Sequence, residues 1–281
     1  MTVLPDYDSP ATLKQFLEER GMSMQKKFGQ NFLVNGSARR KIIDALDVRE
    51  GISVWEVGPG LGAMTDEIIR RGACPVVFEI DRGFCSILQE MFGDHFVLVQ
   101  GDVLKTWKRE LDAHGVPDRF FGNLPYNIAA ALIADTIEAD VRFERAVVTV
   151  QKEVAQRMAA APGSADYSSF SVLCQWAYVV TPVMDLSGGS FWPRPNVDSR
   201  TVLMTRNPAF PGCRNPGLFM RLQRSLFASR RKTVKNNLSR FLQNQETAAK
   251  LLEMAGINPL ERAETLSLEQ LLRLADVASP E

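Results

Sequence analysis

Five short apolar runs alternate with stretches of helical periodicity, and this alternation constrains the fold more than any other feature of the sequence. The runs lie at residues 53–57, 75–80, 96–100, 119–122 and 145–150. Their continuous apolar character is typical of strands buried on both faces of a parallel sheet. Apolar residues recur at helical spacing in the intervening segments 61–71, 83–92 and 128–139. The sequence therefore predicts a doubly wound α/β unit with a mostly parallel, Rossmann-like sheet.

Elements outside this repeat complete the predicted organisation. A short amphipathic helix is expected at 9–21, and runs at 177–186 and 200–205 are expected to form an antiparallel hairpin around a Gly- and Pro-rich loop, 187–199. The stretch 207–217 contains three prolines and two glycines, which is typical of a linker. Helical patterns follow at 217–229, 231–244, 246–255 and 267–276. We therefore expect an α/β domain over 1–207 and a small all-α domain over 208–281.

The charge of the chain is neutral in total but unevenly distributed. Lysine plus arginine and aspartate plus glutamate each number 33. Residues 1–190 carry 19 basic and 25 acidic side chains, whereas residues 191–281 carry 14 and 8. Within 221–240 there are seven basic residues and no acid. A solvated helix face is one interpretation of such a run, but an ordinary surface mixes both signs, so a nucleic-acid contact is favoured.

Cysteine and histidine usage gives no sign of a metal site or of export. Cys74, Cys85, Cys174 and Cys213 form no CxxC pair, and there are two histidines. We expect reduced cysteines, no metal and a cytoplasmic location. The first residues lack the apolar segment of a signal peptide, and no run of about 18 apolar residues occurs, so no membrane insertion is expected.

A glycine turn follows the first predicted strand, and carboxylates follow the next two. The sequence Glu56-Val57-Gly58-Pro59-Gly60-Leu61-Gly62 allows backbone and ligand to approach closely. Glu79 ends the second strand, where a carboxylate can accept both hydroxyls of a ribose, and Asp102 follows the third. The set predicts a nucleoside-bearing cofactor, without choosing between S-adenosylmethionine and NAD.

The fourth predicted strand ends in Gly122-Asn123-Leu124-Pro125-Tyr126-Asn127-Ile128. The exocyclic amine of adenine is a weak nucleophile, and an enzyme that alkylates it must hold the nitrogen in line with the electrophile. The Asn123 side-chain oxygen and the Leu124 carbonyl could accept its hydrogens from a turn stiffened at Pro125, while Tyr126 offers a ring face to the base. A strand-ending turn with an aromatic plug is the alternative interpretation.

These motifs together resemble the rRNA adenine N6,N6-dimethyltransferases of the KsgA type. The similarity runs in order through residues 26–33, 56–62, 79–81, 101–102, 122–127 and 191–199. It implies a class I S-adenosylmethionine-dependent methyltransferase domain and dimethylation of two adjacent adenines in a hairpin near the 3′ end of small-subunit rRNA, in ribosome biogenesis. S-adenosylmethionine is the implied methyl donor.

The resemblance also assigns site residues. Those expected at the cofactor, with the second glycine of the turn included, are Asn31, Leu33, Gly58, Gly60, Glu79, Asp102 and Asn123. Those expected around the target adenine are Asn123, Leu124, Pro125, Tyr126 and Phe191, with Phe191 and Tyr126 as opposite walls that sandwich an extruded base. As a connector between two strands, the 191–195 segment could equally lack any such role.

The basic residues are expected to contact rRNA phosphates, while the pocket reads the base. Arg39 and Arg40 are further candidates beside the principal set, which is Lys26, Lys27, Arg221, Arg224, Arg230, Arg231, Lys232 and Lys235. The expected partner is small-subunit rRNA, and a protein-bound assembly intermediate is favoured as its form, although the sequence does not distinguish this from naked RNA. The enzyme is expected to be a monomer.

Three other functions compete with this interpretation. A resistance-type methyltransferase acting on large-subunit rRNA would share the cofactor turn and the Asn-Leu-Pro-Tyr segment. A ribosome-assembly or transcription factor could keep the fold without turnover. The presence of all the expected site residues argues against it, namely Asn123, Tyr126, Glu79 and Asp102. An NAD-linked oxidoreductase is disfavoured, because no His, Lys or Tyr constellation for hydride chemistry accompanies the glycine turn.

Overall fold

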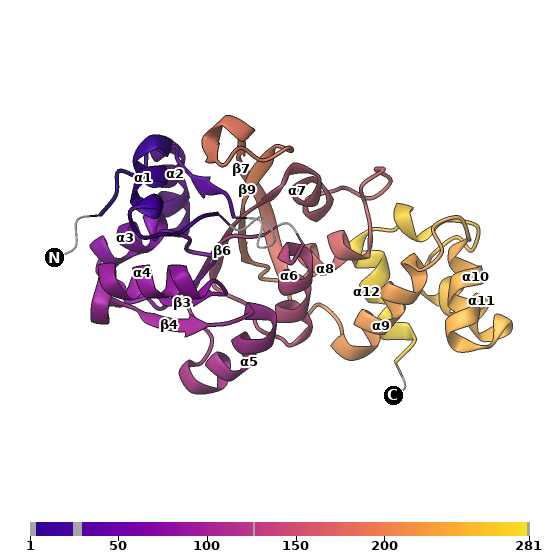
Figure 1. Cartoon of the computed structure of the whole chain (residues 1–281). Helices are drawn as coiled ribbons and strands as arrows, with labels where there is room; N and C mark the ends of the chain where they lie inside the picture. Colours follow the sequence, from indigo (N-terminus) through magenta and orange to yellow (C-terminus); the bar gives the residue numbers. More distant parts are fainter. Residues whose placement is uncertain (1–3, 25–29, 126, 280–281) are drawn as a thin grey trace. The chain divides into compact units, whose positions relative to one another are not determined.

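The computed structural model describes residues 4–24, 30–125 and 127–279, which divide into two compact units (Figure 1). The first unit comprises 1–133, 141–155 and 181–205, and the second comprises 134–140, 156–180 and 206–281. The second unit thus takes two short segments from within the predicted α/β region as well as the C-terminal helices. The domain boundary between 207 and 208 stays a prediction.

A seven-stranded, mostly parallel sheet carries the fold, and its strand order is β4-β3-β2-β5-β6-β9-β7. Strand β2 pairs in parallel with both β3 and β5, β3 with β4, and β5 with β6, whereas β9 runs antiparallel to β6. The α/β fold class is confirmed, and β7 and β9 are neighbours as expected. The strands are β2 Val54–Val57, β3 Val76–Glu79, β4 Val97–Gln100, β5 Arg119–Asn123, β6 Arg145–Gln151, β7 Tyr178–Leu186 and β9 Ser199–Arg206.

Helices follow the parallel strands, and polar caps set where several of them begin. Ser9 caps α1, Asp81 caps α4 and Asp102 caps α5 by accepting backbone N–H groups of the first turn. The helices expected within 9–21, 61–71, 83–92 and 128–139 are confirmed. The observed bounds are α1 Pro10–Glu18, α2 Gly36–Leu46, α3 Ala63–Arg70, α4 Arg82–Phe92, α5 Val103–His114, α6 Ala129–Glu138 and α7 Lys152–Met158. Of these, α2, α5 and α7 were not expected.

A second, very small sheet joins distant parts of the chain. Strand β1 (Phe32–Leu33) pairs antiparallel with β8 (Phe191–Trp192), so that Phe32 lies opposite Trp192 and Leu33 opposite Phe191. Strand β8 lies inside the loop 187–199, directly after the 3₁₀ turn Gly188–Ser190. The loop is therefore more than a connector, because it supplies a strand partner to the segment 32–33.

The second unit is helical at its C-terminal end, as predicted. Its helices pack leucine and aromatic side chains that are fully buried, among them Phe219, Leu238 and Leu271. The Tyr167 hydroxyl donates to the Leu266 carbonyl at 3.1 Å, which ties α8 and its preceding turn to this helical core. The helices are α8 Ser169–Ala177, α9 Pro216–Phe227, α10 Val234–Leu242, α11 Gln245–Met254 and α12 Leu268–Val277.

Across the described part of the chain, no helix has the length and apolar character required to cross a membrane.

Candidate functional site

A cavity of about 340 Å³ opens where the parallel strands β2, β3 and β5 end. This is the edge at which open α/β sheets bind ligands, because successive loops diverge there. All predicted cofactor residues line it, namely Asn31, Leu33, Gly58, Gly60, Glu79, Asp102 and Asn123. Leu124, Pro125 and Phe191 line it as well. The cavity is thus lined by residues from six separate sequence motifs.

The glycine turn forms one wall of the cavity. Gly58, Gly60 and Gly62 have φ values of +72°, +58° and +82°, which lie in the left-handed region that favours glycine. A Cβ atom on Gly60 would lie 2.7 Å from Cε1 of Phe32. The ring of Phe32 in turn packs against Phe84, with ring centroids 5.7 Å apart. The turn therefore brings bare backbone to the cavity, and Phe32 closes it from the side of β1.

Glu79 is held by its own backbone surroundings at the end of β3. Its Oε1 atom accepts the Asp81 N–H at 2.8 Å, and the side chain is 6% exposed. Burial raises the pKa of Glu79 to about 7, the nearby Asp81 carboxylate adds to the increase, and backbone N–H groups partly oppose it. A buried carboxylate of this kind gains from ligand hydroxyl donors, which favour the charged form.

Asp102 occupies the corresponding place after β4. Its Oδ1 atom accepts the Leu104 N–H at 3.0 Å as the N-cap of α5. The Gly101 N–H donates to the Glu79 carbonyl at 2.8 Å and thereby ties the ends of β3 and β4 together. The two carboxylates predicted from successive strand ends therefore border the same cavity.

Glu56 is a cavity residue that the sequence interpretation did not single out. It is fully buried, and its Oε2 atom accepts the Thr65 hydroxyl at 2.7 Å. Its Oε1 atom has no hydrogen-bond partner among the described residues. Burial raises the pKa of Glu56 to about 8, and the Glu79 charge adds to the increase. Its position in β2, directly before the glycine turn, is the sequence signal that could have identified it as a cavity residue.

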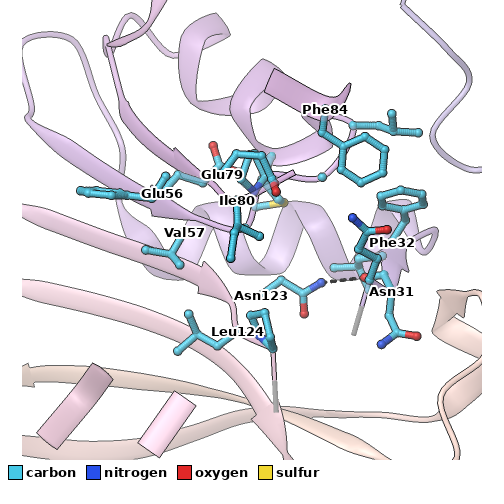
Figure 2. A pocket seen from close by; sticks show the side chains of 18 of the residues that line it. Asn31, Phe32, Glu56, Val57, Glu79, Ile80, Phe84, Asn123 and Leu124 are labelled. Atoms are coloured by element: carbon cyan, nitrogen blue, oxygen red, sulfur yellow. Dashed lines mark hydrogen bonds between the residues drawn. The ribbon is translucent and has the colours of Figure 1, made fainter. Parts of the chain in front are cut away.

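The Asn123 side chain is oriented by the backbone carbonyl of Asn31, the residue directly before β1. Its Nδ2 atom donates to the Asn31 carbonyl at 2.9 Å, which is the dashed bond in Figure 2. Because the amide nitrogen is engaged, the Oδ1 atom is the group left to accept a ligand hydrogen. The Leu124 N–H donates to the Thr149 carbonyl at 3.1 Å, which anchors the next residue to β6. Tyr126 lies outside the described residues, so its expected role in stacking stays a prediction.

Phe191 is 5% exposed and lies opposite Leu33 in the β1–β8 ladder. Since both residues line the cavity, the two-stranded sheet forms one of its walls.

The basic residues predicted to contact RNA differ in whether an acidic side chain pairs with them. Arg224 pairs with Glu138, and Arg230 pairs with Glu264 at 3.0 Å, so both are held within the second unit. Arg221 is exposed. Lys26 and Lys27 lie outside the described residues. Four further cations of the 221–240 stretch form no ion pair with any described residue, and we call them the unpaired basic cluster: Arg231, Lys232, Lys235 and Arg240.

Arg39 corrects one expectation. The sequence makes it a candidate RNA contact, but it is 8% exposed and its guanidinium pairs with Asp8 at 2.6 Å. A buried and paired guanidinium is not available to a phosphate, so this prediction is wrong. Arg40 is exposed.

Within the described ranges, no group of three or more His, Cys, Asp or Glu side chains is arranged to hold a metal ion.

Comparison with known proteins gives consistent matches over nearly the whole chain. A family model described as "Ribosomal RNA adenine dimethylase" matches residues 21–279. The "Ribosomal RNA small subunit methyltransferase A" of Treponema denticola is 46% identical over 280 residues, which cover 97% of this chain and 96% of the relative. The protein of the same name from Geobacillus kaustophilus is 34% identical over 286 residues, covering 98% of each.

Solved structures match as well. A dimethyladenosine transferase from Plasmodium falciparum superposes with a TM-score of 0.72 at 26% identity, covering 85% of this chain and 94% of its own. The 23S rRNA methyltransferase ErmE superposes with a TM-score of 0.66 at 23% identity, covering 87% of this chain and 98% of its own, and shows a shared fold.

Proposed function

Because the chain belongs to the ribosomal RNA adenine dimethylase family, it is an rRNA methyltransferase, and we propose that it dimethylates N6 of two adjacent adenosines in a hairpin near the 3′ end of small-subunit rRNA. The relatives named for the small ribosomal subunit support this choice of substrate. The methyltransferase family excludes the NAD-linked interpretation of the glycine turn.

The cavity fits S-adenosylmethionine. The left-handed glycines admit a ligand close to the backbone, and a Cβ at Gly60 would already collide with Phe32. Glu79 offers a carboxylate to ribose hydroxyls, and Asp102 offers one to the adenine amine. Glu56 Oε1, buried and unpartnered among the described residues, is suited to a positively charged group of the ligand. When bound, S-adenosylmethionine supplies a methyl group on a sulfonium centre.

The observation that carries the proposal is the orientation of Asn123. With Nδ2 bonded to the Asn31 carbonyl, Oδ1 accepts one hydrogen of the target amine and the Leu124 carbonyl accepts the other. Two acceptors hold the nitrogen lone pair toward the incoming methyl group. No general base of shifted pKa is needed, because alkylation would leave the nitrogen positively charged and its N–H proton acidic enough to pass to solvent water. Phe191 contributes an apolar wall to an extruded base.

Basic side chains of the second unit bind the rRNA in this proposal. We assign phosphate contacts to the unpaired basic cluster and to Arg221, since these side chains are not held by acidic partners among the described residues. The proposed working form is a monomer in the cytoplasm that acts on an assembly intermediate of the small subunit.

The test is incubation of the protein with labelled S-adenosylmethionine and ribosomal subunits that lack the modification, followed by mapping of methylated nucleotides in both rRNAs. We expect N6,N6-dimethyladenosine at two adjacent positions of the small-subunit rRNA. Dimethyladenosine in large-subunit rRNA alone would assign the resistance-type activity instead, and no transfer to either would point to a factor without turnover.

A further inference from the structure

Arg39 joins helix α2 to two segments that line the cavity, although neither Arg39 nor the rest of α2 lines the cavity itself. From α2, its Nη1 atom donates to the Leu33 carbonyl at 2.8 Å and to the Tyr7 carbonyl at 3.3 Å. Its Nη2 atom donates to Asp8 Oδ1 at 2.6 Å. The guanidinium carbon lies 5.9 Å from the centroid of the Tyr7 ring. One planar, five-donor cation thus serves acceptors from the N-terminal segment and from β1.

The segments that Arg39 binds are connected directly to the proposed chemistry. Leu33 pairs with Phe191 across the β1–β8 ladder. Two residues before Leu33, the Asn31 carbonyl accepts the Asn123 amide. The Tyr7 hydroxyl donates to the Leu61 carbonyl at 3.0 Å, at the glycine turn. A shift of β1 would therefore move the Asn123 amide and the Phe191 wall together.

The glycine at position 36 leaves space for the Asp8 carboxylate beside Arg39. A Cβ atom on Gly36 would lie 2.8 Å from both carboxylate oxygens of Asp8. Gly36 is the first residue of α2. The absence of a side chain at this position leaves room for the carboxylate.

We propose that Arg39 is a positioning residue for methyl transfer. It fixes the position of β1, and thereby the orientation of Asn123 Oδ1 and the position of the target base against Phe191. This inference rests on the proposed function of the cavity. The physical reason is that in-line transfer tolerates little misplacement, so a displacement of about 1 Å caused by a residue outside the site costs up to about 100-fold in rate. The second methylation depends more on exact placement, because the monomethylated amine has one hydrogen left for the two acceptors.

The first experiment compares Arg39→Met and Arg39→Lys with the unaltered protein on small subunits, under single-turnover conditions. We expect Arg39→Met to lower the rate by about 10- to 100-fold and to raise the ratio of monomethyl- to dimethyladenosine. Arg39→Lys keeps the charge but cannot reproduce the planar fork, so partial recovery is expected. Full recovery by lysine would show that charge alone matters and would overturn the positioning role.

Two further variants separate positioning from stability. Gly36→Ala displaces the Asp8 carboxylate without altering Arg39 itself, so we expect a reduced rate and an increased monomethyl fraction. Arg119→Met removes another buried arginine, paired with Asp47 and Glu144 at the other end of β5. We expect it to lower the melting temperature while leaving the monomethyl fraction unchanged.

The outcomes are decisive in each direction. An unchanged rate and product ratio in folded Arg39→Met and in Gly36→Ala would overturn the proposal, as would an equal change of product ratio in Arg119→Met. If Arg39→Met does not fold, Arg39→Lys and Gly36→Ala decide. Absence of methylation by the unaltered protein would count against the proposed function instead.

Discussion

Glu79 should make nucleoside binding depend on pH in the neutral range. The pKa of its buried carboxyl is raised to about 7, and ribose hydroxyls bind the charged form. About one-tenth of Glu79 is ionised at pH 6 and about nine-tenths at pH 8, so the Kd should be about tenfold weaker at pH 6, or about 1.4 kcal/mol. The affinity therefore increases as the pH rises through 7.

The assay is isothermal titration calorimetry with 5′-methylthioadenosine between pH 6 and pH 8. This ligand carries the ribose and adenine but lacks the amino-acid part, so it has no group of its own that titrates in this range. Glu79→Gln should bind with nearly the same affinity at both pH values and more weakly than the unaltered protein at pH 6, because glutamine mimics the protonated carboxyl and about one-tenth of Glu79 is still ionised at pH 6. Glu67→Gln, an exchange at a half-buried carboxylate whose residue is absent from the cavity lining, is the matched control.

The stability of the ligand-free protein should change with the opposite sign. The pKa of Glu79 is higher in the folded state than its ordinary value of 4.5, so its contribution to stability is fully present below pH 4.5 and is lost as the pH rises through about 7. Glu56, with a pKa of about 8, should extend this loss to higher pH. The calorimetric titrations are therefore repeated in Glu56→Gln, in which this second carboxyl no longer titrates.

A Kd for 5′-methylthioadenosine that does not change with pH would refute the reasoning. A tenfold change of Kd that persists in Glu79→Gln would refute it as well.

Three further variants address the turn, the amide and the RNA-binding surface. Asn123→Ala should lower the single-turnover methylation rate by about 10²- to 10³-fold while the subunits remain bound, since one oriented acceptor is removed; an undiminished rate would exclude that role. Gly60→Ala should lower the free energy of unfolding by about 1–2 kcal/mol from the left-handed backbone alone, measured by urea denaturation, and the clash with Phe32 adds to it. Alanine at all positions of the unpaired basic cluster should reduce the slope of log affinity against log salt by about one for each phosphate that is no longer neutralised, whereas Arg224→Ala, whose cation is already paired with Glu138, should change the slope less.

The elements with strong local periodicity could be predicted from the sequence. The five strands and the C-terminal helices could be predicted because each has its own apolar pattern. The run at 96–100 was expected to be buried, but it forms the edge strand β4, in which Val97 is 40% exposed. Glu79 and Asp102 were placed correctly beside one cavity because the carboxyl ends of parallel strands meet at one edge of a sheet. Here the local signal and the tertiary arrangement agree.

The parts that escaped prediction depend on long-range contacts. Strand β1 has two residues and finds its partner about 160 positions later, so neither strand has a readable pattern. Arg39 stands in an Arg-Arg pair that resembles an exposed basic surface, and its burial follows from Asp8 and two backbone carbonyls. The helix α2 was missed for a related reason, because its basic residues masked the buried face that includes Ile42, Ile43 and Leu46.

The β1–β8 ladder also bears on when the enzyme becomes competent during its own synthesis. A nascent chain that has emerged to residue 150 already holds the glycine turn, both strand-end carboxylates and Asn123. It lacks Phe191 and Trp192, which pair with β1 and close the cavity wall. Contacts of such sequence separation form only after both partners have left the ribosome. A chain still being translated therefore has the residues to which we assign the cofactor before it has the proposed wall for the adenine, so methyl transfer is expected to require a strand from the last third of the polypeptide.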